Sequence, residues 1–135
     1  MKNLLKLTTV LFAIALTLTA CKKDEEETID KTAPTINIIT PANQEAHVSG
    51  DMLHLNVEFS DNDELHEIVA YLITTHMSMV DTVKTIHAHP DAATHTMMEH
   101  YTIGTVTHTD FSFQVVATDH SGNSSTASTG FHVMQ

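Results

Sequence analysis

Apolar and polar residues alternate along two stretches of the chain, and this alternation is the clearest structural signal in the sequence. Between Met52 and Ser60 the apolar residues occupy every second position: Leu53, Leu55, Val57 and Phe59. The second stretch shows the same pattern, with Phe111, Phe113, Val115 and Ala117. Because successive side chains of a β-strand point to opposite faces, a period of two predicts two strands that each bury one face.

The remainder of the chain after Pro34 consists of short β-branched or apolar segments separated by turn residues. We expect further strands at residues 35–40, 65–76, 80–89 and 94–103, and a last strand in which Phe131 and Val133 face inward. Residues 61–64 are expected to end the strand before them. About seven short strands without a convincing amphipathic helix predict an all-β fold, namely an antiparallel sandwich of two sheets.

The N-terminal segment has the layout of a secretory signal. Lys2 and Lys6 precede the apolar run 7–18, which is too short and too close to the terminus for a membrane-spanning helix. Leu18-Thr19-Ala20-Cys21 resembles the lipobox of bacterial lipoproteins, in which the cysteine is lipidated and the signal is removed before it. The resemblance implies a signal peptide at 1–20 and an acylated Cys21 that carries palmitate. The alternative is an ordinary signal peptide with a chance cysteine.

Residues 21–32 are predicted to form an acidic, flexible linker, because they are charged and almost free of apolar side chains. Their start, Cys21-Lys-Lys-Asp-Glu-Glu-Glu, resembles the tag of Bacteroidota lipoproteins that are exported to the cell surface. This resemblance implies a lipid-anchored protein of the outer membrane. The folded domain is expected at 33–135.

The charge balance excludes one class of partner. The chain after residue 20 has four lysines, no arginine and 17 acidic residues, a formal net charge of −13 with neutral histidines. Nucleic-acid binding needs a cationic surface that releases counterions, so we do not expect it. The membrane contact is assigned to the lipid alone. Since Cys21 is the single cysteine, no disulfide is expected in the domain.

The turn residues carry a further resemblance. Ala33-Pro34 with the following segment to Pro41, Gly50 before a strand, and Ala117-Thr-Asp-x-x-Gly-Asn123 resemble a bacterial immunoglobulin-like domain. Together with the lipobox, the whole chain resembles small single-domain Bacteroidota lipoproteins of that kind. The resemblance implies an immunoglobulin-like sandwich and no particular reaction, because the motifs are framework turns. The tryptophan and paired cysteines of antibody domains are absent from the sequence.

Histidine is the unusual residue of this composition. All eleven histidines follow residue 20, and five of them lie between His87 and His108. If residues 90–94 connect a hairpin, His89 stands opposite His95. His87 then stands opposite Met97 on the same face. Opposed side chains have Cβ atoms about 4.5–5.5 Å apart, which is close enough to share a metal ion.

This hairpin predicts a copper or zinc site, because imidazole suits both metals and a thioether favours reduced copper. The predicted ligands are His87, His89, His95 and Met97, with His100 as a substitute if the register slips. The alternative is that these residues are ordinary surface side chains.

Calcium is a less favoured second metal. Hard oxygen ligands are concentrated in two turns: Asp61, Asp63, Glu64, Asp119 and Asn123. The simpler interpretation is that Asp and Asn are there because they accept turn geometry, since no twelve-residue calcium loop is present.

Antiparallel succession of the strands places the turns after residues 60, 89 and 119 at one end, where the first strand also begins. We therefore expect the linker and the polar loops to meet, with the metal site facing the membrane and an outer-membrane receptor or other surface protein as partner.

No phosphate loop, Gly-x-Ser-x-Gly motif or catalytic cysteine is present, so a non-enzymatic binding module is predicted. The alternative is a metal-free adhesion or assembly module that contacts a protein or glycan.

Overall fold

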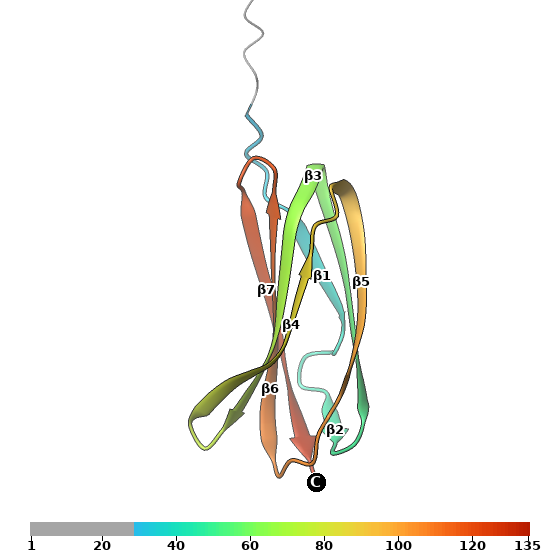
Figure 1. Ribbon diagram of the computed structural model, residues 1–135, viewed down its shortest axis with the longest axis vertical. Coiled ribbons are helices and arrows are strands. Elements are labelled where there is room, and N and C mark those ends of the chain that lie inside the picture. The colour runs from blue at the N-terminus through green and yellow to red at the C-terminus, as the bar shows by residue number, and fades with distance from the viewer. Residues whose placement is uncertain (1–28) are drawn as a thin grey trace, which may run out of the picture.

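The computed structural model describes residues 29–135, and these residues form seven β-strands and no helix (Figure 1). The strands are β1 (Thr35–Thr40), β2 (Ala46–Val48), β3 (Met52–His76), β4 (Met79–Ala88), β5 (Ala92–Thr102), β6 (Thr109–Asp119) and β7 (Ser124–Met134). The predicted all-β fold is confirmed. The described residues contain no helix that is long and apolar enough to cross a membrane. The predicted signal peptide, Cys21 and linker residues 21–28 lie outside the described part.

β3 organises the sandwich because it belongs to both layers. Its first part pairs with β1 and β5, and its second part pairs with β4 and β6. Figure 1 shows β3 turning over at the end of the molecule where the N-terminal segment enters. β7 extends the second layer beside β6, and β2 pairs with β7 in the parallel direction. One continuous sheet of seven strands therefore folds over into an immunoglobulin-like sandwich.

Two details of the predicted strand pattern are corrected by the structure. Residues 61–64 were expected to end a strand, but they lie inside β3, and the register shifts between Ser60 and Leu65. Turn-forming residues here bend a strand between two layers without ending it. β2 was not predicted, because three residues are too few to show an alternation.

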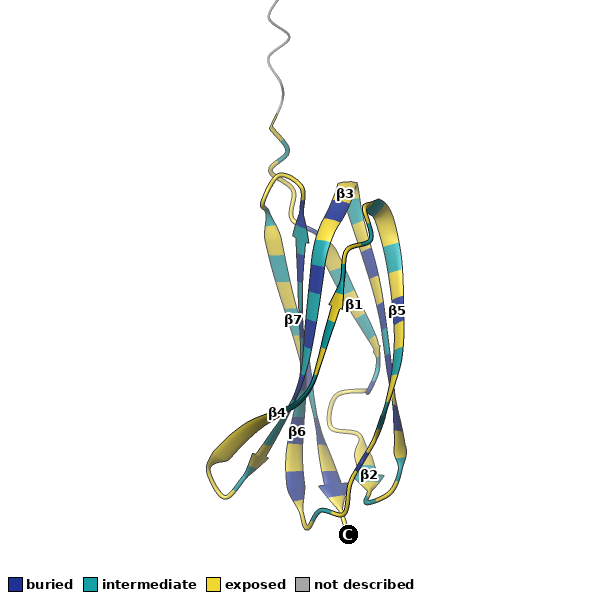
Figure 2. Ribbon diagram, in the orientation of Figure 1, coloured by how far each residue is buried: buried dark blue, intermediate teal, exposed yellow. Residues whose placement is uncertain are grey.

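The core lies between the layers and follows the predicted alternation (Figure 2). The predicted inward residues of β3, β6 and β7 are all buried: Leu53, Leu55, Val57, Phe59, Phe111, Phe113, Val115, Ala117, Phe131 and Val133. The second part of β3 adds Leu65, Ile68, Ala70 and Leu72 to the same cluster. Burial of these apolar faces at about 25 cal/mol per Å² is the main force that holds the two layers together.

The predicted β4–β5 hairpin pairing is wrong. β4 pairs with the second part of β3, and β5 pairs with the first part, so the connection at residues 89–91 crosses from one layer to the other. The cause lies before β4. A two-residue turn at Met77 and Ser78, both with positive φ, joins β3 directly to β4 and fixes the register of β4 against β3.

Candidate functional site

The residues predicted to bind copper or zinc are distributed over both layers. His87 is exposed opposite Val69 on β3, whereas His95 stands opposite Phe59. Met97 is 4% exposed and belongs to the hydrophobic core. The predicted pairs His89–His95 and His87–Met97 are therefore not formed, because β4 and β5 pair with different parts of β3.

The two other histidines of the predicted set have separate neighbours. The Nδ1 atom of His89 lies 3.1 Å from the backbone oxygen of His66. The ring of His100 lies edge-on to that of His54, with 4.8 Å between the centroids. Among the predicted ligands, only His89 therefore lies beside a second cluster of side chains that could bind a metal.

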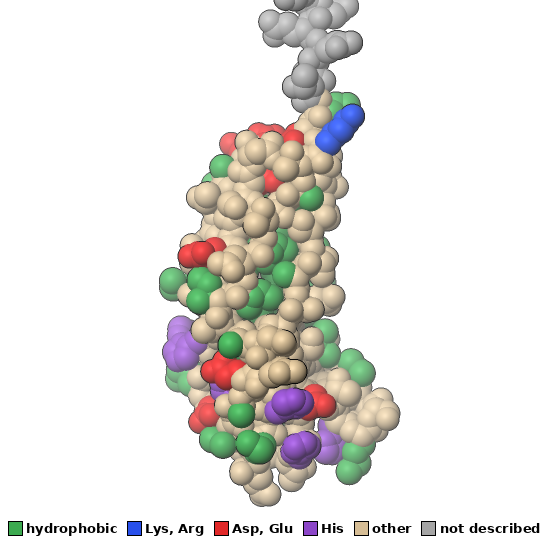
Figure 3. Space-filling view, turned by 180° about the vertical axis from the view of Figure 1, so that it is seen from behind, with side chains coloured by type: hydrophobic (Ala, Val, Ile, Leu, Met, Phe, Trp, Pro, Cys, Tyr) green, Lys and Arg blue, Asp and Glu red, His purple; other side chains and the backbone are tan. Residues whose placement is uncertain are grey.

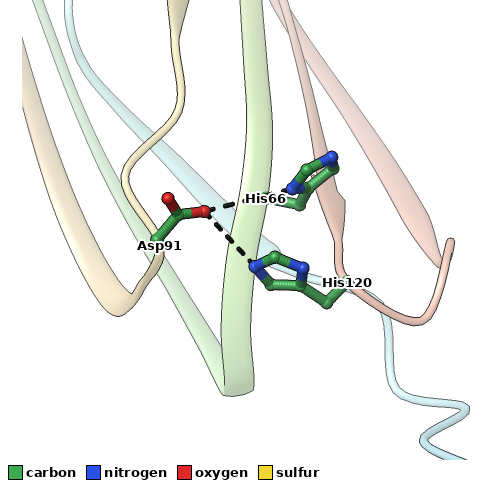
Figure 4. A group of neighbouring side chains, drawn as sticks. All are labelled: His66, Asp91 and His120. Carbon is green, nitrogen blue, oxygen red and sulfur yellow. Dashed lines mark ion pairs between the residues drawn. The ribbon is translucent and has the colours of Figure 1, made fainter.

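That cluster consists of His66, Asp91 and His120 (Figure 4). Asp91 Oδ1 lies 3.3 Å from His120 Nε2 and 4.0 Å from His66 Nδ1. One potential ligand atom from each residue lies within 4.8 Å of the other two. All three side chains are partly open to solvent, so an ion from solution can reach them.

The strand register explains why three residues so far apart in sequence meet. Leu65 on β3 is fully buried and pairs with Ala92 on one side and with Asp119 on the other. His66, Asp91 and His120 are the sequence neighbours of these three paired residues. The cluster is therefore held by the backbone of the sandwich end.

Two further groups surround the cluster. Glu64 Oε2 lies 3.9 Å from His120 Nε2, and the His120 backbone N–H donates a 3.2 Å hydrogen bond to the Glu64 carbonyl. The ring centroids of His66 and His120 are 4.5 Å apart, and the ring centroid of His89 lies 6.0 Å from that of His66. The site thus offers nitrogen and oxygen donors and no sulfur among the described residues.

A separate acidic cluster joins Asp30, Asp61 and Asp119, whose carboxylates also lie within 4.8 Å of one another. Of the residues predicted for calcium, Asp61 and Asp119 are brought together, and Asp30 is an addition. Glu64 points to His120, while the Asp63 N–H donates to Asp61 Oδ1 at 3.0 Å.

Hydrogen bonds organise this acidic cluster. Asp119 is 1% exposed, and it accepts hydrogen bonds from the backbone N–H of Asn123 at 2.8 Å and from its side-chain amide at 2.7 Å. The pKa of Asp30 lies below its usual value, mainly because its carboxylate accepts a hydrogen bond from the backbone N–H of Thr32 and a second one from the side chain of Asn62. Asn62 donates to Asp30 Oδ2 at 2.9 Å, and Asn123 donates to the Asp30 carbonyl at 3.1 Å. The N-terminal segment is therefore bound to the polar loops at this end, as the succession of strands predicted.

The sequence prediction did not include His66 and His120, because each has no other histidine close to it and its partners are far away in the sequence. Asp91 was treated only as a turn residue. The available signal was the predicted meeting of the turns at one end, which places residues next to 61–64, 89–91 and 119–123 close together. A count of histidines per segment instead favoured the 87–97 region.

The sequence matches one protein-family model over residues 19–134, and that model is described as "Domain of unknown function (DUF4625)". The chain belongs to the DUF4625 family. The match includes all seven strands of the described DUF4625 sandwich. No curated protein matches the sequence.

Several solved structures are similar in fold to this DUF4625 chain. The fibronectin(III)-like modules of Clostridium thermocellum CbhA have a TM-score of 0.49 at 14% identity, over 76% of this chain and 47% of that one. A Niemann-Pick type C2 protein from the Japanese carpenter ant has a TM-score of 0.49 at 5% identity, and the match covers 73% of this chain and 89% of the ant protein. Murine CRIg has a TM-score of 0.46 at 10% identity, and the match covers 76% of this chain and 98% of the CRIg chain. The chain spans about half the length of the CbhA chain that it matches.

Proposed function

We propose that this DUF4625 protein is a lipid-anchored, non-enzymatic protein of the outer membrane, exposed at the cell surface, whose immunoglobulin-like domain binds a protein partner. The observation that carries the proposal is the tip of the β3–β4 hairpin. Figure 1 shows this tip standing away from the rest of the sandwich, far from the end where the N-terminal segment enters.

The hairpin tip is apolar and exposed. Met77, Met79 and Val80 are 86%, 71% and 70% exposed, and His76 pairs with Met79 across the turn. Flexible methionine side chains adapt to varied apolar surfaces, and methionine is enriched where proteins contact one another. Several neighbouring apolar side chains on an otherwise acidic domain favour a protein partner with an apolar recess.

The anchor supports the same orientation. The lipobox resemblance at 18–21 puts the lipid a few residues before the described chain, which begins at the opposite end from the hairpin. The predicted linker, residues 21–32, is short enough to keep the domain near the membrane. The hairpin tip then points away from the bilayer, toward an outer-membrane receptor or another surface protein.

Site-specific photo-crosslinking in cells tests this proposal. A photoreactive residue at Ser78 is expected to give a crosslink to a discrete protein, and changing Met79→Ser and Val80→Ser together should remove that crosslink. The matched control carries the photoreactive residue at Thr126, an exposed position near the start of β7. Equal crosslinking from both positions, or a crosslink that survives the two serine changes, would contradict a partner site at the hairpin tip.

A further inference from the structure

We propose that His66, Asp91 and His120 form a binding site for one zinc ion at the end of the sandwich where the N-terminal segment enters. The proposal is independent of the partner site at the hairpin tip. It also differs from the copper or zinc site predicted from the sequence, because it uses none of the residues predicted to bind those two metals.

The chemistry of the donors selects the class of metal. Two imidazole nitrogens and a carboxylate oxygen suit a divalent ion of intermediate softness such as zinc. Reduced copper prefers sulfur ligands, and the candidate methionine, Met97, is buried in the core. Calcium and magnesium prefer sites made of oxygen atoms alone. Zinc therefore suits these three side chains better than reduced copper, calcium or magnesium does.

The distances lie close to those of a zinc site. Zinc bonds of about 2.0–2.2 Å in a tetrahedral arrangement place neighbouring ligand atoms roughly 3.3–3.5 Å apart. Asp91 Oδ1 and His120 Nε2 are already 3.3 Å apart, and Asp91 Oδ1 to His66 Nδ1 is 4.0 Å. Side-chain rotations that move His66 by about 1 Å complete the triangle, and exposed side chains make such rotations at low cost.

The backbone beneath the site is fixed before any ion arrives. Leu65 is fully buried and holds Ala92 and Asp119 on either side, so the backbone positions next to them are set by the fold. Binding then orders three side chains and no loop, which limits its entropic cost. Asp91 sits at a φ of 44°, a conformation that Asp tolerates better than most residues because its short side chain can hydrogen-bond locally.

The surroundings supply a fourth ligand and a favourable field. Glu64 Oε2 is 3.9 Å from His120 Nε2, within reach of an ion held by the other three groups. The three carboxylates of the acidic cluster lie at the same end of the sandwich, and the chain carries a large negative charge. Both features raise the local concentration of cations and speed their capture at low ionic strength.

A metal-free interpretation makes a different prediction. In that interpretation the three groups are surface contacts between two imidazoles and a carboxylate, which contribute little to stability and do not bind zinc at micromolar concentration. Zinc titration therefore separates the two interpretations.

Isothermal titration calorimetry on the purified full chain, stripped of metal, measures the binding. We expect one zinc per chain with a dissociation constant of about 10 μM or tighter. Changing His66→Ala and His120→Ala together should weaken binding by at least about 100-fold. Asp91→Asn, which keeps a residue that accepts positive φ, should weaken it by at least about tenfold.

The matched control removes two histidines elsewhere. His54 and His132 lie at the opposite end of the strands. Changing both to alanine should therefore leave the zinc affinity unchanged within about twofold. Figure 3 shows histidines gathered toward that end on the rear face. Millimolar or weaker affinity, or equal losses from the site and control variants, would overturn the proposal.

A second readout does not depend on any variant. Upon addition of one equivalent of zinc, the ring signals of His66 and His120 should shift or broaden in NMR spectra, while those of His87 and His95 stay in place. Zinc-dependent changes centred on His87 and His95 would assign the metal to the region predicted from the sequence and would also overturn the proposal.

Discussion

Asp119 shows how one residue can serve both the fold and the polar end of the domain. Within residues 29–135 it is the one charged side chain that is fully buried, and both of its carboxylate oxygens accept hydrogen bonds from Asn123. These bonds hold the turn between β6 and β7 and thereby the position of His120. The turn motif that resembled an immunoglobulin-like framework therefore also positions a residue of the proposed zinc site.

Replacing Asp119 should be costly. Asp119→Ala leaves the partly buried backbone N–H of Asn123 without its acceptor and removes one of the two acceptors of its side-chain amide, so the free energy of unfolding should fall by about 1–3 kcal/mol. The control is Asp110→Ala, which removes an exposed ion pair with His132 and should cost less than about 1 kcal/mol. Urea unfolding of both variants makes the comparison. Equal costs would show that the buried hydrogen bonds do not stabilise the turn.

At the scale of residues, sequence was a good guide to burial and a poor one to ligands. Alternation of apolar and polar residues identified the inward faces of β6 and of the first part of β3. A strand that buries one face has an apolar residue at every second position, and this pattern is visible within the segment itself. The zinc ligands could not be identified in this way. Their proximity depends on Leu65 pairing with two strands that are remote in sequence.

At the scale of elements, the β3–β4 hairpin decides the arrangement of the second half of the sandwich. Its two-residue turn uses Met77 at φ 47° and Ser78 at φ 70°, and neither residue type favours this conformation. The sequence therefore lacks the Asn-Gly signal by which such a turn is usually recognised. The sequence instead predicts a hairpin of β4 and β5, because the connection between them contains the more conspicuous turn residues.

A turn with the preferred residues should stabilise the protein. Met77→Asn and Ser78→Gly together suit two positive φ values, so the free energy of unfolding should rise by roughly 1 kcal/mol in urea unfolding. The same pair introduced into strand β7, as Ser124→Asn and Ser125→Gly, should lower it, since Asn and Gly disfavour strands. A loss of stability from the turn variant would indicate a different backbone at residues 77–78.

At the scale of the whole molecule, the two ends of the sandwich have different chemistry. The polar loops, the histidine–aspartate cluster, the acidic cluster and the entry of the N-terminal segment share one end, and the apolar hairpin tip stands away from it. In the proposed arrangement the zinc site faces the membrane and the partner site faces outward. Antiparallel strand succession predicted the meeting of the loops, because each strand reverses the direction of the last.

The proposed anchor, Cys21, lies outside the described residues. Changing Cys21→Ser should release the protein from the membrane fraction or leave it unprocessed, because several acyl chains on one cysteine are needed for stable attachment. Cell fractionation with immunoblotting measures this. A variant that stays in the membrane at the size of the processed protein would contradict the lipobox assignment.

The location of a bound zinc ion tests the central claim most directly. Crystals of the zinc-loaded protein, measured on both sides of the zinc absorption edge, give an anomalous difference map that shows the ion itself. We predict one strong peak within about 2.0–2.2 Å of a nitrogen from His66, a nitrogen from His120 and an oxygen from Asp91. A peak at His87 and His95 instead, or a map with no peak between β3, β6 and the β4–β5 connection, would contradict the account.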